Sequence, residues 1–475
     1  MTRNQELAKN TIVLTIGRIC TQSISFFLLP LYTAILKPEE YGIFDLLTTY
    51  VALLVPIFNL ELDMGLFRFL LDIRQDNEKQ KKLFSTIFLA NIFQALIFGG
   101  IYLIVYRYLS FEYKEFLLID VLLTIFLNTL LQYCRGIGKN LQYSFASFLS
   151  ASITVLLNVV FIAILHIGII GMFYANIISK SITIFYLFIE EKIYKIFNLK
   201  SVNVNILKKV IKYSLPLIPN QFSWWIIGSS DRIIISKVLG LGINGIYSVA
   251  NKFSSLYVTF YNVFNLAWTE TVSVHIDDHD NIDFLNNTID MLFKLFTSIS
   301  FIIIALMPFL FNLFIGESYN EAYNQIPILM IAVLFQMIVG LYSAVYTALK
   351  KSSEVAKTSF DAAIINIVID LIFIHSIGLY AASISTLVAF MIMAIYRYYH
   401  IKKYIDIKLN KKTMIFSFII GVIIITLYYV NKYIINCMLL LVVFTYSILI
   451  NKKLIHSVSK EIKDKFFEFR NKYRG

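Results

Sequence analysis

Residues 229–253 of the chain read SSDRIIISKVLGLGINGIYSVANKF. This stretch places Asp231 next to Arg232, and adds Lys237 and Lys252, in otherwise apolar sequence. An ionised side chain at the centre of a bilayer costs roughly 3 kcal/mol even on lenient insertion scales. If the segment lies in a membrane, its charges therefore need partners on other helices or a wet cavity.

The composition is that of a membrane protein. Of the 475 residues, 58% are hydrophobic and 15% are charged, with a mean hydropathy of +0.72. A soluble domain carries about 25% charged residues. The apolar runs reach about 20 residues, the length of a membrane-crossing helix, and show no alternating segments of about 10 residues, as barrel strands would. The sequence predicts an all-α integral membrane protein.

The polar segments divide the chain into about fourteen predicted transmembrane helices. Their approximate limits are 11–36, 41–64, 83–106, 116–134, 143–165, 169–189, 213–239, 245–273, 287–313, 325–349, 354–375, 378–399, 413–430 and 434–450. The polar start MTRNQELAKN leads into the first run without a small-residue cleavage pattern, so we expect an uncleaved first span. An even number of spans places both termini on one side of the membrane.

Lysine and arginine residues predict which side that is. With the N-terminus inside, the outer segments hold only four of the 42 basic residues: Lys37, Arg107, Lys114 and Lys432. This is the asymmetry of the positive-inside rule, and it predicts cytoplasmic termini. The net charge of +12 is then explained by a basic cytoplasmic surface, and we expect no nucleic-acid partner.

The segments between the spans leave little room for catalysis. No large polar insert is present, the outer loops are short, and no GxxxxGK[ST] phosphate loop occurs. The cysteines Cys20, Cys134 and Cys437 are far apart and lie in or beside apolar runs. We expect no enzymatic activity, no disulfide, no metal site and no cofactor.

The opening stretch has a counterpart near the N-terminus. ILKPEEYGIFDL (residues 35–46) matches VLGLGINGIYSV (238–249) at a constant offset of 203, and IIGMFYANII (169–178) matches SIGLYAASIS (376–385). Both pairs lie at outer turns, so spans one to six and seven to twelve read as parallel repeats that bind cargo between the halves. Chance similarity among apolar helices is the alternative.

The predicted domains are a lobe over 1–200, a second lobe over 201–403, an additional hairpin over 404–450 and a basic cytoplasmic tail over 451–475.

Ionisable residues are scattered through the predicted spans. The deep ones are Arg18, Asp45, Lys180, Asp231, Arg232, Lys237, Lys252, Asp361 and Asp370; Glu61, Asp63, Asp120 and Glu270 are closer to helix ends, where we expect water or headgroups to reach them. Such groups either face a wet cavity or form salt bridges between helices. Adjacent helical residues point about 100° apart, so at least one of Asp231 and Arg232 needs a partner on another helix or in a cavity. The deep basic residues on several helices favour an anionic cargo.

Two prolines open the seventh predicted span in YSLPLIPNQFSWW, residues 213–225. Pro216 and Pro219 either kink this helix and free backbone carbonyls, with Asn220 and Gln221 lining a path, or Pro216 only marks the helix start. Both interpretations stay open at the level of sequence.

These motifs together resemble a known family. The stretches YSLPLIPN, SSDRIIISKVLG and NGIYSVANKF, with FFLLPLYTAILKPEEYGIFDL in the first half, resemble the Wzx-type polysaccharide-biosynthesis flippases of the O-antigen and capsule pathways. These belong to the MATE-like MOP exporter superfamily. The resemblance covers nearly the whole chain.

The resemblance implies two six-helix lobes in a V around an alternating-access cavity, with two extra C-terminal helices. It implies a bacterial inner-membrane location and a cargo of oligosaccharide on undecaprenyl pyrophosphate. Other polysaccharide-assembly membrane proteins are further expected partners. Basic residues would hold the pyrophosphate, with Arg18, Lys180, Arg232 and Lys252 as candidates by position. An ion or voltage gradient, of H⁺ or Na⁺, would supply energy through acidic residues, with Asp231, Asp361 and Asp370 as candidates and Asn220 and Gln221 as further cavity residues.

Four rival functions remain at this stage. A drug or cation exporter of the same superfamily calls for a net acidic pocket, whereas the deep positions lean basic. A lipid II flippase differs only in cargo. A membrane enzyme of glycan assembly is disfavoured by the short outer loops, and a scaffold has no use for charges at the bilayer centre.

Overall fold

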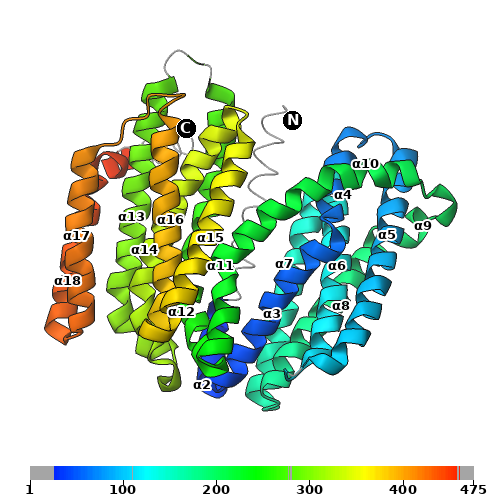
Figure 1. Ribbon diagram of the computed structural model, residues 1–475, viewed down its shortest axis with the longest axis horizontal. Helices are drawn as coiled ribbons and strands as arrows, with labels where there is room; N and C mark the ends of the chain where they lie inside the picture. The colour runs from blue at the N-terminus through cyan, green and yellow to red at the C-terminus, as the bar shows by residue number, and fades with distance from the viewer. Residues whose placement is uncertain (1–25, 110, 277, 279–280, 457–458, 461–475) are drawn as a thin grey trace, which may run out of the picture. The chain divides into compact units, whose positions relative to one another are not determined.

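The described chain is built from helices. A computed structural model describes residues 26–109, 111–276, 278, 281–456 and 459–460, and within them no strand occurs. The helices are α2 (Leu29–Ile35), α3 (Pro38–Asn59), α4 (Leu62–Asp72), α5 (Asn77–Val105), α6 (Lys114–Gly136), α7 (Asn140–Asn158), α8 (Ile169–Glu190), α9 (Ile193–Ile196), α10 (Val204–Ser214), α11 (Ile218–Val238), α12 (Leu241–His275), α13 (Asn281–Phe314), α14 (Ala322–Ala348), α15 (Ser352–Ile377), α16 (Leu379–Ile401), α17 (Lys411–Val430) and α18 (Tyr433–Ile450) (Figure 1).

The all-α membrane class is confirmed, while the count of fourteen spans stays a prediction. Among the described residues, eleven helices are long and apolar enough to cross a membrane. Helices α11 and α12, which contain the opening stretch, are not among the eleven, because polar side chains lower their hydropathy. Most of the first expected span, 11–36, lies outside the described residues. Large apolar side chains on α5, α15, α17 and α18 are exposed, as expected of surfaces that contact lipid.

The described residues fall into two compact units. The first contains those of Met1–Lys252, Phe314–Ala322 and Ser359–Ser385, and the second those of Phe253–Leu313, Tyr323–Thr358 and Thr386–Gly475. The predicted lobe boundaries at 200 and 403 remain predictions. In the second unit, α17 and α18 pack as a pair (Figure 1). All of the candidate sites described below belong to the first unit.

The predicted second span, 41–64, is two helices rather than one. Helix α3 ends at Asn59 and α4 begins at Leu62. The linking residues Leu60 and Glu61 both have left-handed backbone angles, with φ of 53° and 54°. Such angles cost roughly 1–2 kcal/mol for each residue other than glycine. Packing around the break must supply that energy.

The prolines at the start of the predicted seventh span lie at a helix junction. Pro216 is in a 3₁₀ turn, Leu215–Leu217, and Pro219 is in the first turn of α11, where a missing N–H leaves no helical hydrogen bond unmade. The turn follows α10, which lies across the ends of α4 and α5 (Figure 1). The prolines therefore lie where α10 is joined to α11 without a gap through the 3₁₀ turn, and both interpretations of Pro216 remain predictions.

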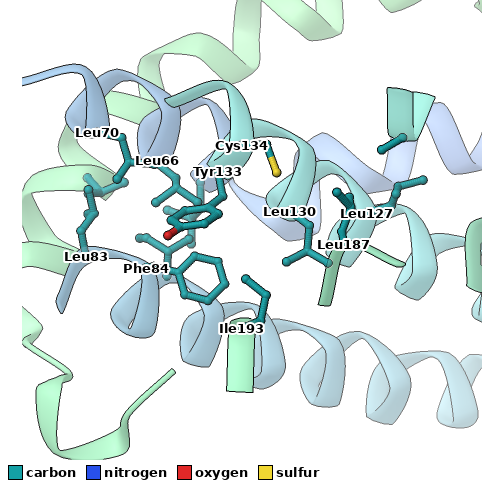
Figure 2. Packing of buried hydrophobic residues seen from close by; sticks show 14 residues of the cluster. Leu66, Leu70, Leu83, Phe84, Leu127, Leu130, Tyr133, Cys134, Leu187 and Ile193 are labelled. Atoms are coloured by element: carbon teal, nitrogen blue, oxygen red, sulfur yellow. The ribbon is translucent and has the colours of Figure 1, made fainter. Parts of the chain in front are cut away.

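An apolar core holds α4, α5, α6 and α8 together, along with the short α9 and α10. Figure 2 shows its side chains, with Tyr133 and Phe84 at its centre and Leu66, Leu70 and Leu83 beside them. The two rings have centroids 4.6 Å apart. Each fully buried leucine contributes about 1.5–3 kcal/mol, so this cluster fixes how α4 follows the strained link at residues 60–61.

The two repeated stretches pack directly on each other. A Cβ on Gly42 of α3 would lie 1.9 Å from the carbonyl oxygen of Leu241, and a Cβ on Gly245 of α12 would lie 2.0 Å from that of Pro38. The contact is reciprocal at the offset of 203, since 38 plus 203 is 241 and 42 plus 203 is 245. The amide of Asn244 adds a 2.9 Å hydrogen bond to the carbonyl oxygen of Gly42. Glycine is required on both sides because backbone fills the space.

We expect Gly42→Ala and Gly245→Ala to destabilise the protein by about 3 kcal/mol, the upper end for overpacking, because the clash is with backbone rather than with a movable side chain. The measurement is the melting temperature of the detergent-solubilised protein. Gly228→Ala on α11 is the matched control, because its Cβ would meet nothing within 4 Å. Equal melting temperatures for all three variants would contradict the close contact.

Candidate functional site

A polar cavity of about 450 Å³ lies among α3, α4, α6, α8 and α11 of the first unit. Its lining contains three carboxylates, one amine, amides and hydroxyls, together with apolar side chains. The residues are Phe44, Thr48, Val51, Ala52, Val55, Pro56, Asn59, Glu61, Asp63, Met64, Asp120, Thr124, Asn128, Asn176, Lys180 and Gln221. Pockets for small molecules are usually mostly apolar with few polar groups, so this lining suits a polar ligand.

The amine of the cavity is held by a carboxylate. Lys180 on α8 forms an ion pair with Asp120 on α6 and donates a 2.9 Å hydrogen bond to the Thr124 hydroxyl. Asn176, one turn before Lys180, donates to the other Asp120 oxygen at 3.0 Å. Each group therefore has a partner, and the pair adds no net charge. The cavity keeps an excess of two carboxylates, Glu61 and Asp63.

A second polar cluster surrounds the Asp231–Arg232 dipeptide. Arg232 Nε lies 3.0 Å from Asp45 on α3, close enough for an ion pair but without the alignment of a hydrogen bond. Ser248 on α12 donates to the other Asp45 oxygen at 2.6 Å, and Tyr247 donates to Asp231. The expectation that this dipeptide finds partners on other helices is confirmed. Asp45 and Ser248 are themselves equivalent positions of the repeat.

Asp370 is the least satisfied charge among the described residues of this cluster. It lies on α15, is 0% exposed, and neither of its carboxylate oxygens has a hydrogen-bond partner in the described part of the chain. It interacts electrostatically with Asp231, a carboxylate of the same sign. One turn away, Asn366 donates a 3.2 Å hydrogen bond to Ser385 on α16. Two neighbouring buried carboxylates favour uptake of a proton or a cation.

The expected phosphate-binding residues do not gather in one place. Lys180 lines the cavity, whereas Arg232 and Lys252 both act on Tyr41 in the second cluster. Arg18 lies outside the described residues. The sequence predictions for these residues therefore remain proposals.

The acidic and amide candidates are also divided. Gln221 lines the cavity, and Asp231 and Asp370 are buried in the second cluster. Asn220 is half-buried in the first turn of α11, and Asp361 is exposed.

Three cavity residues lie near helix ends, as expected, but are buried. Glu61 is the N-cap of α4, Asp63 is in its first turn, and Asp120 is in the second turn of α6. They were expected to be reached by water or headgroups, but they are 6%, 8% and 7% exposed and line the cavity. The break after Asn59 lets α3 and α4 turn the first two inward, and Asp120 lies in the second turn of α6, against α8. Pro56 inside an apolar run, followed by polar residues at 59, 61 and 63, was the available signal.

Solved structures of low sequence identity share the fold. A structure described as the lipid II flippase MurJ in an inward closed conformation has a TM-score of 0.70 at 16% identity, covering 94% of this chain and 100% of that one. An inward-facing multidrug resistance MATE family transporter of the MOP superfamily has a TM-score of 0.67 at 16% identity, covering 81% and 96%. A MOP superfamily transporter from Pyrococcus furiosus, described as having a binding pocket of reverse polarity, has a TM-score of 0.55 at 17% identity, covering 82% and 94%.

The fold is therefore that of MATE-like and MurJ-like membrane transporters. No curated protein matches the chain. The family model described as polysaccharide biosynthesis protein matches residues 7–269, more than half of the 475 residues. The chain belongs to the polysaccharide biosynthesis protein family.

Proposed function

We propose that the protein is a flippase, which moves oligosaccharide repeat units on undecaprenyl pyrophosphate from the inner to the outer leaflet of the bacterial cytoplasmic membrane by alternating access. The observation that carries the proposal is the polar cavity of about 450 Å³ inside a transporter fold, in a chain of the polysaccharide biosynthesis protein family. Both termini are proposed to be cytoplasmic. The bilayer and other polysaccharide-assembly proteins are the proposed partners, and no catalytic role is assigned.

The cavity supplies what an oligosaccharide lacks in a bilayer. A hydroxyl moved from water to an apolar medium without a hydrogen bond costs roughly 2–7 kcal/mol, and each sugar carries several. Amides and hydroxyls that line the cavity can exchange hydrogen bonds with a sugar; they are Thr48, Thr124, Asn128, Asn176 and Gln221. The lipid tail needs no such path, because the outer helix faces are apolar.

The pyrophosphate is assigned to basic side chains. Lys180 is the strongest candidate, since it lines the cavity and its partner Asp120 can be replaced by a phosphate oxygen. Arg232, Lys252 and Arg18 are the further candidates from sequence. An arginine is suited to two-point contact with phosphate oxygens, but Arg232 must first leave Asp45.

Energy coupling is assigned to Asp231 and Asp370. Their carboxylates interact, and Asp370 lacks a hydrogen-bond partner among the described residues, so binding of a proton or sodium ion here is favourable. A bound proton or sodium ion changes the net charge of the cluster that also contains Arg232 and Asp45. The ion gradient is thereby linked to Arg232, the side chain proposed to contact the pyrophosphate of the cargo. Asp361 is exposed and receives no role.

Two alternatives keep specific support. A lipid II flippase is supported by the similarity in fold to a structure with that name. A MATE-type drug or cation antiporter is supported by the excess of carboxylates in the cavity, where Glu61, Asp63 and Asp120 face one lysine. The molecule that accumulates in cells lacking the protein distinguishes the proposed function from these two alternatives.

Deletion of the gene is expected to trap lipid-linked repeat units on the cytoplasmic face. The measurement is lipid extraction from intact and inverted membrane vesicles after treatment with an impermeant sugar-oxidising reagent, with a complemented strain as the control. Reaction of the units only in inverted vesicles supports the proposal. Accumulation of lipid II alone, or hypersensitivity to cationic dyes with normal lipid pools, would transfer the function to one of the alternatives.

The ion pair of Arg232 with Asp45 permits a test of the cargo contact that is separate from folding. Arg232→Ala leaves a buried carboxylate unpaired, which costs about 3–5 kcal/mol. The double variant Asp45→Asn/Arg232→Gln removes both charges of this ion pair, so we expect it to insert and to melt close to the parent but to produce no surface polysaccharide. Normal polysaccharide from the double variant would reduce Arg232 to a packing residue.

Asp370→Asn tests the coupling assignment, since it removes the charge at almost constant volume. We expect transport in vesicles to lose its stimulation by imposed proton or sodium gradients, by a factor of about 5 to 150, the usual range of coupling between two sites. Asp361→Asn is the comparison on the same helix, where the carboxylate is exposed. Unchanged stimulation in Asp370→Asn would remove this residue from the mechanism.

A further inference from the structure

The break between α3 and α4 places two carboxylates in the cavity without a cation beside them. Glu61 and Asp63 are 6% and 8% exposed. The Glu61 side chain makes no hydrogen bond or ion pair within the described part of the chain, and the charged group that acts on it is Asp63, of the same sign. The amine of the cavity, Lys180, is already paired with Asp120.

The neighbouring unpartnered atoms are also hydrogen-bond acceptors. Asn59 is 1% exposed and lines the cavity, yet its Oδ1 has no hydrogen-bond partner among the described residues. Its orientation is fixed, because its Nδ2 donates a 2.8 Å hydrogen bond to Asp63 and a flipped amide would turn its oxygen toward that carboxylate. The side-chain amide of Gln94 donates a 3.1 Å hydrogen bond to the backbone carbonyl oxygen of Asn59.

The backbone adds further acceptors on the same wall. Pro56 lies inside α3 and has no N–H, so the Ala52 carbonyl lacks its helical donor. Ala52 and Pro56 both line the cavity. The C-terminal end of α3 carries the negative end of the helix dipole, equivalent to about half an elementary charge. The two carboxylates, the amide oxygen and the C-terminal end of α3 are therefore close together in the chain at the break, whereas the Ala52 carbonyl lies seven residues, roughly 10 Å, before Asn59 along the helix.

Oxygen acceptors at an interrupted helix are the arrangement by which transporters coordinate small cations. We propose that the α3–α4 break is a binding site for a monovalent cation of the sodium or potassium class. Its ligands are the carboxylates of Glu61 and Asp63 and Oδ1 of Asn59. In the described part of the chain no group of three or more acidic, histidine or cysteine side chains is placed to hold a metal ion; the proposed site has two carboxylates, Glu61 and Asp63, and an amide oxygen.

The proposed site explains the strained link. Two consecutive left-handed residues other than glycine persist only where their surroundings over-determine them, and such strain gathers at ligand sites. The link turns Asn59, Glu61 and Asp63 toward one space, which a continuous helix would not do, since residues two apart in a helix point about 200° apart. The ion then offsets the repulsion between the carboxylates that the break brings together.

Ion binding to the purified full-length protein tests the proposal without any cargo. The assay is the melting temperature in sodium, potassium or choline chloride at constant ionic strength, with binding of radioactive sodium as a second measurement. Asp370→Asn is the background for every sample, so that the buried carboxylate assigned to coupling contributes nothing. Within this background, sodium or potassium is expected to raise the melting temperature over choline.

Glu61→Gln and Asn59→Ala are the test variants, and Glu78→Gln, an exposed carboxylate on the first turn of α5, is the matched control. We expect the test variants to lose affinity for the cation by about 10- to 100-fold, the range seen when groups that hold a metal are removed, and the control to keep it. Glu61→Gln is also expected to melt higher than its parent in choline, because the repulsion from Asp63 is gone. If the Glu61 carboxylate had only a structural role, Glu61→Gln would melt lower than its parent in choline.

Three results would overturn the proposal. An equal cation-dependent shift in Glu61→Gln and in its parent would place the ion elsewhere. No shift with either alkali ion in the parent would show that no such ion binds. Stabilisation by glucosamine, but not by sodium or potassium, would assign the acidic break to an amine of the cargo. All three are independent of whether the protein moves lipid-linked sugars, because no transport is measured.

Discussion

The reciprocal contact of Gly42 with Gly245 is the constraint on which the first unit depends. The offset of 203 pairs Pro38 with Leu241 and Gly42 with Gly245. Because glycine has no side chain, Gly42 leaves room for the backbone carbonyl of Leu241, and Gly245 leaves room for that of Pro38. A contact in which each element meets its own equivalent is the geometry of a two-fold interface. Because no side chain separates the backbones, the register of α3 against α12 is fixed within this contact.

That register determines which charges meet. One turn beyond Gly42, Asp45 reaches both Ser248, its own equivalent at offset 203, and Arg232 on α11. Asp231 then accepts hydrogen bonds from the Tyr247 hydroxyl and from the backbone N–H of Arg232, while the Arg232 side chain pairs with Asp45. A shift of α3 by one residue would rotate Asp45 by about 100° away from the arginine and leave two buried charges unpaired. Glycine packing and ion pairing therefore support each other.

Much of the fold could be predicted from the sequence, because hydropathy over about 20 residues reports membrane spans directly. The repeat was found through Gly42 and Gly245, where backbone contact restricts the residue type. The break after Asn59 was missed, because neither Leu60 nor Glu61 is glycine or proline, and left-handed geometry is rare in other residues. Helix α10 was also missed, since its lysines are typical of an inner loop and its apolar face becomes evident only against α4 and α5.

The site was harder to predict than the fold, because a charge in sequence does not name its partner. Lys180 and Gln221 were predicted as cavity residues and line the cavity, but the carboxylates that outnumber Lys180 were assigned to helix ends. Hydropathy ranks a carboxylate near a span boundary as exposed. Only the packed structure shows that Glu61 and Asp120 are buried and line one cavity. Arg232, for example, pairs with Asp45, which lies 187 positions earlier in the sequence.

The acidic cavity and an anionic cargo are compatible if the two proposals are taken together. With Lys180 neutralised by Asp120, the described lining has an excess of two negative charges, and these repel a pyrophosphate in a medium of low dielectric constant. A cation at the α3–α4 break removes part of that repulsion, and a pyrophosphate that displaces Asp120 from Lys180 in turn alters the affinity for the cation. Linkage requires that each ligand change the affinity of the other by the same factor. A break that gathers carboxylates, with a lysine farther along the same cavity, therefore gives a transporter a physical means to make entry of an anionic lipid depend on an ion.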